Sequence, residues 1–398
     1  MDDLPFSQPF LLSGKISQQF LELGGMPKGG CTEQWLCDNP RVLEKLVKQL
    51  AVAGVTYITV PTFGANSVAL GDYSLKNSVL TINQRLVSVV RNAAFSDTII
   101  GGGLAPAVSM CDDEEALSMD ELVAVYREQI KALADAGVEY LYFASMTSLV
   151  QMRAGVMAAK EFSLPVMVSV LAEENGKTPD GAGFLPCLLT LQNQDITAFG
   201  IDGFSWSQDM LSLFKNSAPY SQVPFIAVAE NPCEQENIDF TKLCMDYGVS
   251  VFGVQKSENI DDFIDLSNLI KNNEIKPIKK DLCRIAANEA EAFFLLDDEN
   301  LFLSAPVDCS FDIADELIDL EDESINVAKV EINSMEEALL LSQNAHMSRL
   351  PIAIVTDSIE VLKRTLYLYN GIALVCSDCE IEYEELCKVA KQYGAIVI

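Results

Sequence analysis

The chain has 398 residues, 49% of them hydrophobic, which is enough to fill two globular cores. Its formal net charge of −31 argues against nucleic acid and anionic membrane as partners, because Lys and Arg must neutralise the phosphates of both. No run approaches the roughly 18 uncharged apolar residues of a membrane span, and the acidic start lacks the basic stretch of a signal peptide. We expect a cytoplasmic protein with no nucleic-acid or membrane partner.

Cysteine and histidine usage narrows the chemistry further. Eleven cysteines scattered through predicted helices and strands suit a reducing compartment better than a disulfide framework. The one histidine, His346, falls near the end of a predicted helix, where exposure to solvent or an interaction with the helix dipole explains it. A single histidine at this position excludes most catalytic mechanisms that depend on histidine.

Strand and helix patterns alternate through the first two thirds of the chain. A glycine-rich loop at residues 24–30 follows the first strand, and a helix begins near Asn39 with Pro40 in its first turn. Further helical patterns cover residues 81–94, 120–136 and 259–269. The predicted strands are residues 11–14, 55–60, 98–103, 139–143, 165–170, 199–204, 224–228 and 249–254.

Eight strands alternating with helical intervals predict a (β/α)8 TIM barrel, an α/β fold whose chemistry lies at the carboxyl ends of its strands. The alternative is a doubly wound open sheet, but no GxGxxG or GxxxxGK[ST] loop follows any strand. The triple glycine at residues 101–103 is better explained by close backbone packing than by phosphate binding.

A shift in composition after residues 275–280 predicts a domain boundary. From Asp281 to Ile398 there are 24 acidic and 7 basic residues, a net charge of −17, which is most simply a solvated acidic face. We therefore divide the chain into a barrel at residues 1–280 and an acidic α/β domain at residues 281–398. The second domain resembles a partial barrel whose covering layer comes from the first domain or a partner.

Within the second domain, the β-rich segments 291–296 and 301–307 predict a hairpin around residues 297–300. Strands and helices then alternate to the end of the chain. The predicted strands are residues 327–332, 352–355, 373–376 and 395–398, and the helices are residues 335–344, 359–369 and 383–393.

Motifs across residues 8–272 resemble the homocysteine S-methyltransferase family, as in the N-terminal module of cobalamin-dependent methionine synthase. No single motif is decisive, but five occur in order at matching strand positions. They are Thr62-Phe-Gly-Ala-Asn66, the Ile82-Asn83 pair, Gly102-Gly-Leu-Ala-Pro106, the helix with Tyr126, Gln129-Ile130 and Ala136-Gly-Val138, and Pro165-Val-Met-Val-Ser169 with Glu174-Asn-Gly176. The tail from Leu350 to Ile398 looks like the early part of that enzyme's pterin-binding domain, cut short.

The resemblance implies a zinc ion held by three cysteines at the ends of strands six and eight, which binds the homocysteine sulfur as a thiolate. This chain has Gly203 at the first of these positions, and Gln255 and Lys256 at the other two. An amide and a protonated lysine cannot replace two thiolates in a tetrahedral sulfur site. We expect no cofactor. We also expect that the activity, methyl transfer to a thiol, is altered or lost.

Other positions of the implied pocket also differ from the family pattern. The first strand ends in Ser13-Gly-Lys15, the fourth in Ala144-Ser145, and Pro61 precedes Thr62. In the tail, Val355 and Cys376 replace the family's pterin-contacting Asp and Asn. The candidate pocket residues are Ser13, Thr62, Phe63, Asn66, Ser145, Asp202, Glu230, Gln255 and Lys256.

Two alternatives for the chemistry of the site remain open. Cys31, Cys37, Cys111 and Cys233, with Glu230 nearby, follow predicted strands and could form a relocated metal site, although partly buried thiols explain them more simply. The same reasoning applies to Cys376 and Cys379, which have CxxC spacing without a second pair.

Lys256 could bind an anion or form a Schiff base, but an ion pair with Asp202 or Glu230 is the simpler interpretation.

Two functions of different class follow from the sequence. One is a methyltransferase that binds a small-molecule thiol or amino acid without the zinc site. The other is a non-catalytic binding or assembly module that accompanies corrinoid or folate one-carbon proteins. The replaced cysteines favour the second function.

Overall fold

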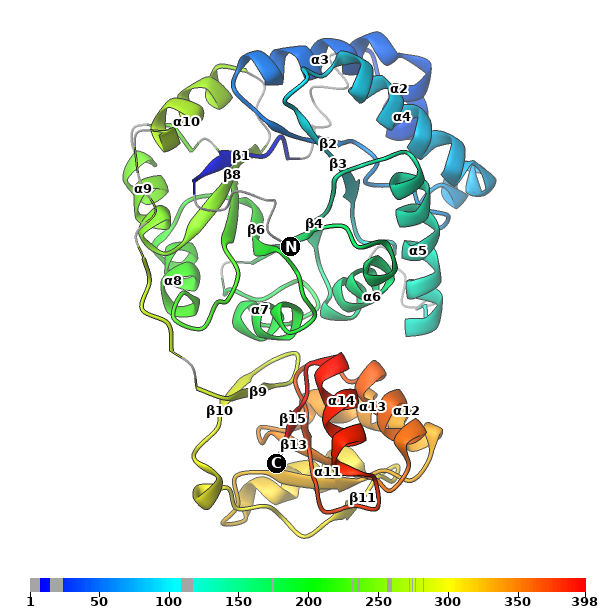
Figure 1. The fold of residues 1–398 in the computed structure, drawn as a ribbon, viewed down its shortest axis with the longest axis vertical. Coiled ribbons are helices and arrows are strands. Elements are labelled where there is room, and N and C mark those ends of the chain that lie inside the picture. Colours follow the sequence, from blue (N-terminus) through cyan, green and yellow to red (C-terminus); the bar gives the residue numbers. More distant parts are fainter. Residues whose placement is uncertain are drawn as a thin grey trace. The chain divides into compact units, whose positions relative to one another are not determined.

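The computed structural model describes residues 8–14, 24–108, 117–173, 175–230, 232–234, 237–255, 260–271, 273, 275, 277–281 and 283–398. The chain divides into two compact units (Figure 1). The first contains Met1–Asp180 and Asp195–Lys280, and the second contains Gly181–Gln194 and Asp281–Ile398. In the part of the chain that is described, no helix has the length and apolar character needed to cross a membrane.

The first unit is built on eight parallel strands arranged in the order β1-β8-β7-β6-β5-β4-β3-β2. A parallel bridge between Leu12 and Tyr57 links the two ends of this order, and helices surround the ring (Figure 1). The predicted (β/α)8 barrel is therefore confirmed. The strands are β1 Phe10–Leu11, β2 Tyr57–Val60, β3 Ile99–Leu104, β4 Tyr140–Met146, β5 Val166–Leu171, β6 Ala198–Phe204, β7 Phe225–Glu230 and β8 Val249–Gln255.

The helices of the first unit follow the predicted pattern with one addition. Helix α2 occupies a stretch just after the predicted glycine-rich loop that the sequence left without an element. Local signals fix several ends: Pro40 begins α3, and a capping box between Ser118 and Glu121 begins α5. The helices are α2 Thr32–Asp38, α3 Pro40–Val52, α4 Val79–Ala93, α5 Met119–Asp135, α6 Leu149–Ala159, α8 Gln208–Ser217, α9 Ile238–Asp246 and α10 Asp261–Lys271.

Aromatic side chains fill the barrel interior. Phe10 stacks on Tyr57 with ring centroids 4.0 Å apart, and Tyr57 lies 5.9 Å from Tyr140. A Cβ atom on Gly101 would overlap the ring of Tyr140, so this strand must carry glycine to admit the ring. The expectation that the triple glycine serves close packing is confirmed.

Helix α7 (Phe184–Gln192) is apolar on every side and belongs to the second unit, although the chain connects it to β5 and β6. The backbone N–H of Gly183 donates to the carbonyl of Glu289 at 2.9 Å, and Nδ2 of Asn193 donates to the carbonyl of Gly394 at 3.3 Å. The second unit thus includes a segment that the sequence assigned to residues 1–280.

The core of the second unit is a parallel sheet in the sequential order β11-β12-β13-β14-β15. Its strands are β11 Val307–Asp308, β12 Ala328–Glu331, β13 Ile352–Val355, β14 Leu374–Val375 and β15 Ile396–Val397. The helices are α11 Ile313–Asp319, α12 Met335–Asn344, α13 Ile359–Leu368 and α14 Tyr383–Tyr393, of which α11 was not predicted.

The predicted hairpin of the second unit is wrong in its pairing. Strand β10 (Ala292–Phe294) pairs antiparallel with β9 (Ile285–Ala287), and residues 301–307 pair instead beside β12. Side chains of this hairpin pack with Ala353 and Leu374 of the sheet. The sequence analysis expected the first domain or a partner to cover this sheet. The hairpin of the second unit covers part of it instead.

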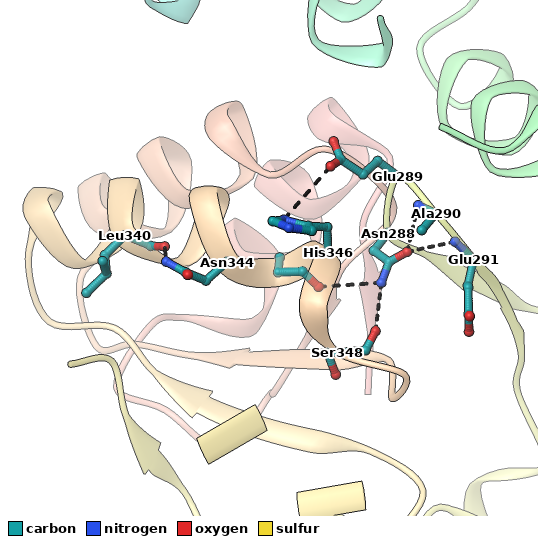
Figure 2. Close-up of polar contacts among 9 residues, drawn as sticks. Asn288, Glu289, Ala290, Glu291, Leu340, Asn344, His346 and Ser348 are labelled. Atoms are coloured by element: carbon teal, nitrogen blue, oxygen red, sulfur yellow. Dashed lines mark hydrogen bonds and ion pairs between the residues drawn. The ribbon is translucent and has the colours of Figure 1, made fainter. Parts of the chain in front are cut away.

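The turn between β9 and β10 is fixed by the buried side chain of Asn288 (Figure 2). Its Oδ1 accepts from the N–H groups of Ala290 at 2.9 Å and Glu291 at 2.8 Å. Its Nδ2 donates to the carbonyls of Ala345 at 3.4 Å and Ser348 at 2.9 Å. One amide thus closes the hairpin and joins it to the chain that follows α12.

His346 lies in this same region, at the end of a helical stretch and half exposed. Its Nδ1 is 4.0 Å from Oε1 of Glu289 (Figure 2). The sequence expectation of a solvent-facing histidine near a helix end is confirmed.

Replacing Asn288 tests this junction. We expect Asn288→Ala to lower the free energy of unfolding by about 3 kcal/mol, because two buried carbonyls lose their donor and two turn N–H groups lose their acceptor. Urea unfolding followed by circular dichroism measures the change. Asn333→Ala, which removes only an exposed hydrogen bond to Glu331, is the matched control and should change stability by less than about 0.5 kcal/mol. Equal losses in the two variants would contradict this assignment.

Candidate functional site

Strand alternation directs three polar side chains into the carboxyl end of the barrel interior. Ala198, Val228 and Val251 belong to the interior core of β6, β7 and β8. Side chains on a strand alternate between faces, so residues two or four positions further along face the same way. Asp202, Glu230 and Gln255 occupy these positions.

The carboxylate of Asp202 is buried and receives hydrogen bonds from the end of β4. Its Oδ2 accepts from the backbone N–H of Ser145 at 2.8 Å and from its hydroxyl at 3.0 Å. The hydroxyl of Tyr142 lies 3.5 Å from the same oxygen and 2.7 Å from Oγ of Ser169. Burial raises the pKa of Tyr142 well above its ordinary value, and the charge of Asp202 raises it further, so the phenol remains a protonated donor.

The backbone is distorted at both strand ends that meet Asp202. Ser145 has φ +52°, at an irregularity in the pairing of β4 with β5. Gly203 has φ +70°, at an irregularity in the pairing of β6 with β7. The left-handed region costs a non-glycine residue about 1–2 kcal/mol, so the contact of Ser145 with Asp202 is made at a conformational cost.

Glu230 and Gln255 continue the polar surface. Oε2 of Glu230 accepts from the hydroxyl of Ser205 at 3.0 Å, and Glu230 lies opposite Gln255 in the pairing of β7 with β8. A Cβ atom on Gly203 would lie 3.8 Å from Nε2 of Gln255. The ends of β6 and β8 therefore face each other.

Thr62, Phe63 and Asn66 lie on the opposite side of the barrel, in the loop after β2. The hydroxyl of Thr62 donates to the carbonyl of Gly103 at 2.8 Å, and Phe63 packs against the barrel core. Oδ1 of Asn66 accepts from the N–H groups of Val68 and Ala69. Each side chain fixes the loop itself.

Side chains from three helices hold this loop from outside. Glu33 on α2 accepts from the N–H of Gly64 at 2.7 Å. Asn83 on α4 donates to the carbonyl of Ala65 at 2.8 Å, and Gln129 on α5 donates to the carbonyl of Thr62 at 2.6 Å. The loop is a braced wall of the barrel rather than a free segment.

The remaining candidates are placed as follows. Oγ of Ser13 accepts from the N–H of Thr59 at 2.9 Å, which joins the seam between the first two strands. Lys256, Lys15 and Cys111 lie outside the described residues. The sequence identified Ser145 and Asp202 but missed Tyr142 and Ser169, which strand alternation on β4 and β5 could have placed in the interior.

A parallel barrel with polar groups at the carboxyl ends of its strands is the architecture of a large class of barrel enzymes. Residues 11–253 match the family model of homocysteine S-methyltransferases. The chain therefore belongs to the homocysteine S-methyltransferase family.

Similar proteins agree with this assignment. The chain is 22% identical over 210 residues to methionine synthase of Mycobacterium leprae (strain TN) and 20% identical over 210 residues to that of Mycobacterium tuberculosis (strain ATCC 25618 / H37Rv). Each match covers 49% of this chain but only 17% of the relative, so the chain spans a small part of these relatives.

Among solved structures, the metallated form of the homocysteine methyltransferase MmuM from Escherichia coli aligns with a TM-score of 0.58 at 14% identity. The alignment covers 66% of this chain and 96% of that protein, and at this identity it supports the fold alone.

The side chains at the ends of β6 and β8 do not fit the zinc site that the family implies. Gly203 offers no donor atom, and Gln255 offers an amide where a thiolate is needed. No group of three His, Cys, Asp or Glu residues suited to a metal occurs among the residues that the structure describes.

Three of the cysteines named as alternatives, Cys37, Cys233 and Cys376, have a raised thiol pKa. Burial, with Asp265 and Asp262 nearby, raises the pKa of Cys233 to about 12, and burial raises the pKa of Cys37 to about 11. Burial likewise raises the pKa of the Cys376 thiol. A metal at any of these sulfurs would first have to displace a strongly held proton.

Two replacements of Ser145 separate its hydrogen bond from its backbone strain. Ser145→Ala and Ser145→Gly both remove a hydroxyl bond to a charged group, a loss of about 1.5–3 kcal/mol. Glycine also relieves the positive φ, so we expect the glycine variant to be more stable than the alanine variant by about 1 kcal/mol. Urea unfolding measures both values.

Ser163 provides the matched control, because it is exposed and has the same φ of +52°. The same preference for glycine over alanine should appear there, with a smaller loss relative to the native serine. A Ser145→Ala variant as stable as the native protein would show that the bond to Asp202 contributes nothing.

Proposed function

We propose that this barrel has lost zinc-dependent methyl transfer to a thiol and acts as a binding or assembly module beside corrinoid or folate one-carbon proteins. One observation carries the proposal. Gly203 and Gln255 face each other at the strand ends where the family's cysteines would converge, and neither supplies a thiolate.

The charge of the site supports the same conclusion. A free thiol with a pKa of about 8.5 is only a few per cent thiolate at pH 7, and a metal normally removes this limit. Here the interior positions carry the carboxylates of Asp202 and Glu230. Negative charge raises the pKa of a neighbouring thiol, so homocysteine in this pocket would be held in its unreactive form.

The braced loop after β2 and the polar interior support retention of a pocket. The hydrogen bonds of Glu33, Asn83 and Gln129 keep the wall in place without help from a metal. The polar interior would suit a small polar ligand, and the resemblance to methionine synthases supports a corrinoid or folate protein as the partner.

Zinc content tests the loss of the metal site. We expect purified protein to contain far less than one zinc per chain by elemental analysis, because the three thiolate ligands are missing. MmuM from Escherichia coli, purified in parallel, is the positive control. Stoichiometric zinc that is released when the cysteines are alkylated would overturn the proposal and point to a relocated thiolate site.

Homocysteine binding tests the thiol pocket separately. A ligand that binds only the native state stabilises it by RT ln(1 + [L]/Kd), about 1.4 kcal/mol at ten times Kd. We expect no change in melting temperature at millimolar homocysteine and no methionine from a methyl-transfer assay. A saturable rise in melting temperature that disappears in Gln255→Ala would instead support a zinc-independent methyltransferase.

A further inference from the structure

Strand β10 and the segment after it carry apolar side chains on two faces. Those on one face pack against the buried core of the second unit's sheet: Phe293, Leu295, Leu301 and Leu303. Side chains of an extended chain alternate between faces, so the residues between these four face the other way. They are Phe294, Leu296 and Phe302, with exposed fractions of 49%, 55% and 57%. We call these three side chains the β10 face.

A tight turn and one asparagine hold the two parts of the β10 face in place. The N–H of Asn300 donates to the carbonyl of Asp297 at 2.8 Å, which keeps the Cα atoms of these residues within about 7 Å. Oδ1 of Asn326 accepts from the N–H of Phe302 at 2.7 Å, and its Nδ2 donates to the carbonyl of Asn300 at 2.7 Å. The face is therefore fixed before any partner binds, which lowers the conformational cost of binding.

The charge around the β10 face has a single sign. Glu291 precedes the face in the chain, Asp297 and Glu299 lie in its turn, and all three are exposed. Residues 285–328 contain 13 acidic residues and no Lys or Arg. Exposed apolar side chains bordered by negative charge complement a surface that combines apolar groups with positive charge.

Net charge decides between the partners that could cover this face. The first 280 residues carry −14 of the net charge of −31, and residues 281–398 carry −17. Neither the barrel nor a second copy of the chain therefore complements the acidic residues here. A partner with clustered Lys and Arg does.

We propose that the β10 face binds a partner protein through a basic amphipathic segment. Apolar side chains of that segment cover Leu296 and Phe302, and its Lys and Arg residues pair with Asp297 and Glu299. Aromatic side chains often dominate the energy of an interface, so Phe302 is the main contact. The face lies wholly in the second unit, so the inference holds whether or not the barrel is catalytic.

A synthetic amphipathic helix of leucine and lysine, labelled with fluorescein, probes the face on the full chain. We expect saturable binding by fluorescence anisotropy at about 0.15 M salt, and we expect Phe302→Ser to weaken it by at least about tenfold. Phe95→Ser is the matched control, because Phe95 is 51% exposed but lies in the first unit. It should leave the affinity unchanged. Equal affinities of the two variants, or no binding by the native chain, would refute the proposal.

Altered peptides and a charge variant separate the two parts of the contact. Serine in place of leucine removes the apolar side, glutamate in place of lysine reverses the charge, and neither peptide should bind. Asp297→Asn combined with Glu299→Gln changes only exposed charges, so the fold should persist and binding should weaken roughly threefold, with a smaller effect at about 1 M salt. A serine–lysine peptide that binds as tightly as the leucine–lysine peptide would contradict the proposal, because only net charge would then matter.

Sedimentation velocity tests whether a second copy covers the face instead. We expect the native chain and Phe302→Ser to sediment alike. A native chain that self-associates, together with a Phe302→Ser chain that does not, would assign the β10 face to a second copy and overturn the proposal.

Discussion

The buried carboxylate of Asp202 imposes a requirement that shapes the carboxyl end of this barrel. A carboxylate removed from water needs donors from the protein, and those of Ser145 lie 57 positions away in the chain. To present both its N–H and its hydroxyl, Ser145 adopts a left-handed conformation at an irregular point of β4. The phenol of Tyr142 and the hydroxyl of Ser169 extend the network to β5. The need of the buried Asp202 carboxylate for hydrogen-bond donors thus determines the backbone conformation of Ser145 at the end of β4.

The opposite wall is held by side chains of the helices that surround the barrel. Amides and a carboxylate from α2, α4 and α5 hold successive backbone atoms of residues 62–66, so the loop is shaped by the helices around the barrel. These contacts explain why the motif does not depend on the side chains at the ends of β6 and β8. Its residues serve the packing of the loop, which a change of chemistry in the interior does not disturb.

Sequence patterns predicted the barrel because its buried strands are continuous apolar runs and its helices end at glycines such as Gly137. The same reasoning failed where one side chain decides the turn. Asn288 closes the hairpin of the second unit with two hydrogen bonds and anchors it to the chain after α12 with two more. Residues 297–300, which carry more turn-forming residues, form only a short helical turn. The contact between Ser145 and Asp202 depends on irregular strand pairing, which local periodicity does not encode. Only the family motif indicated that Gly203 and Gln255 would approach each other across the ends of β6 and β8.

Helix α7 has a consequence for how the protein is made. Its sequence is apolar on all sides, and part of its binding surface is translated much later: Asn193 pairs with Gly394, 201 residues further along. At synthesis rates of about 5–20 residues per second, that interval lasts roughly 10–40 s. During this time the ribosome-bound chain carries an apolar helix that lacks its final cover. Folding of the second unit therefore cannot be completed before Gly394 has been translated.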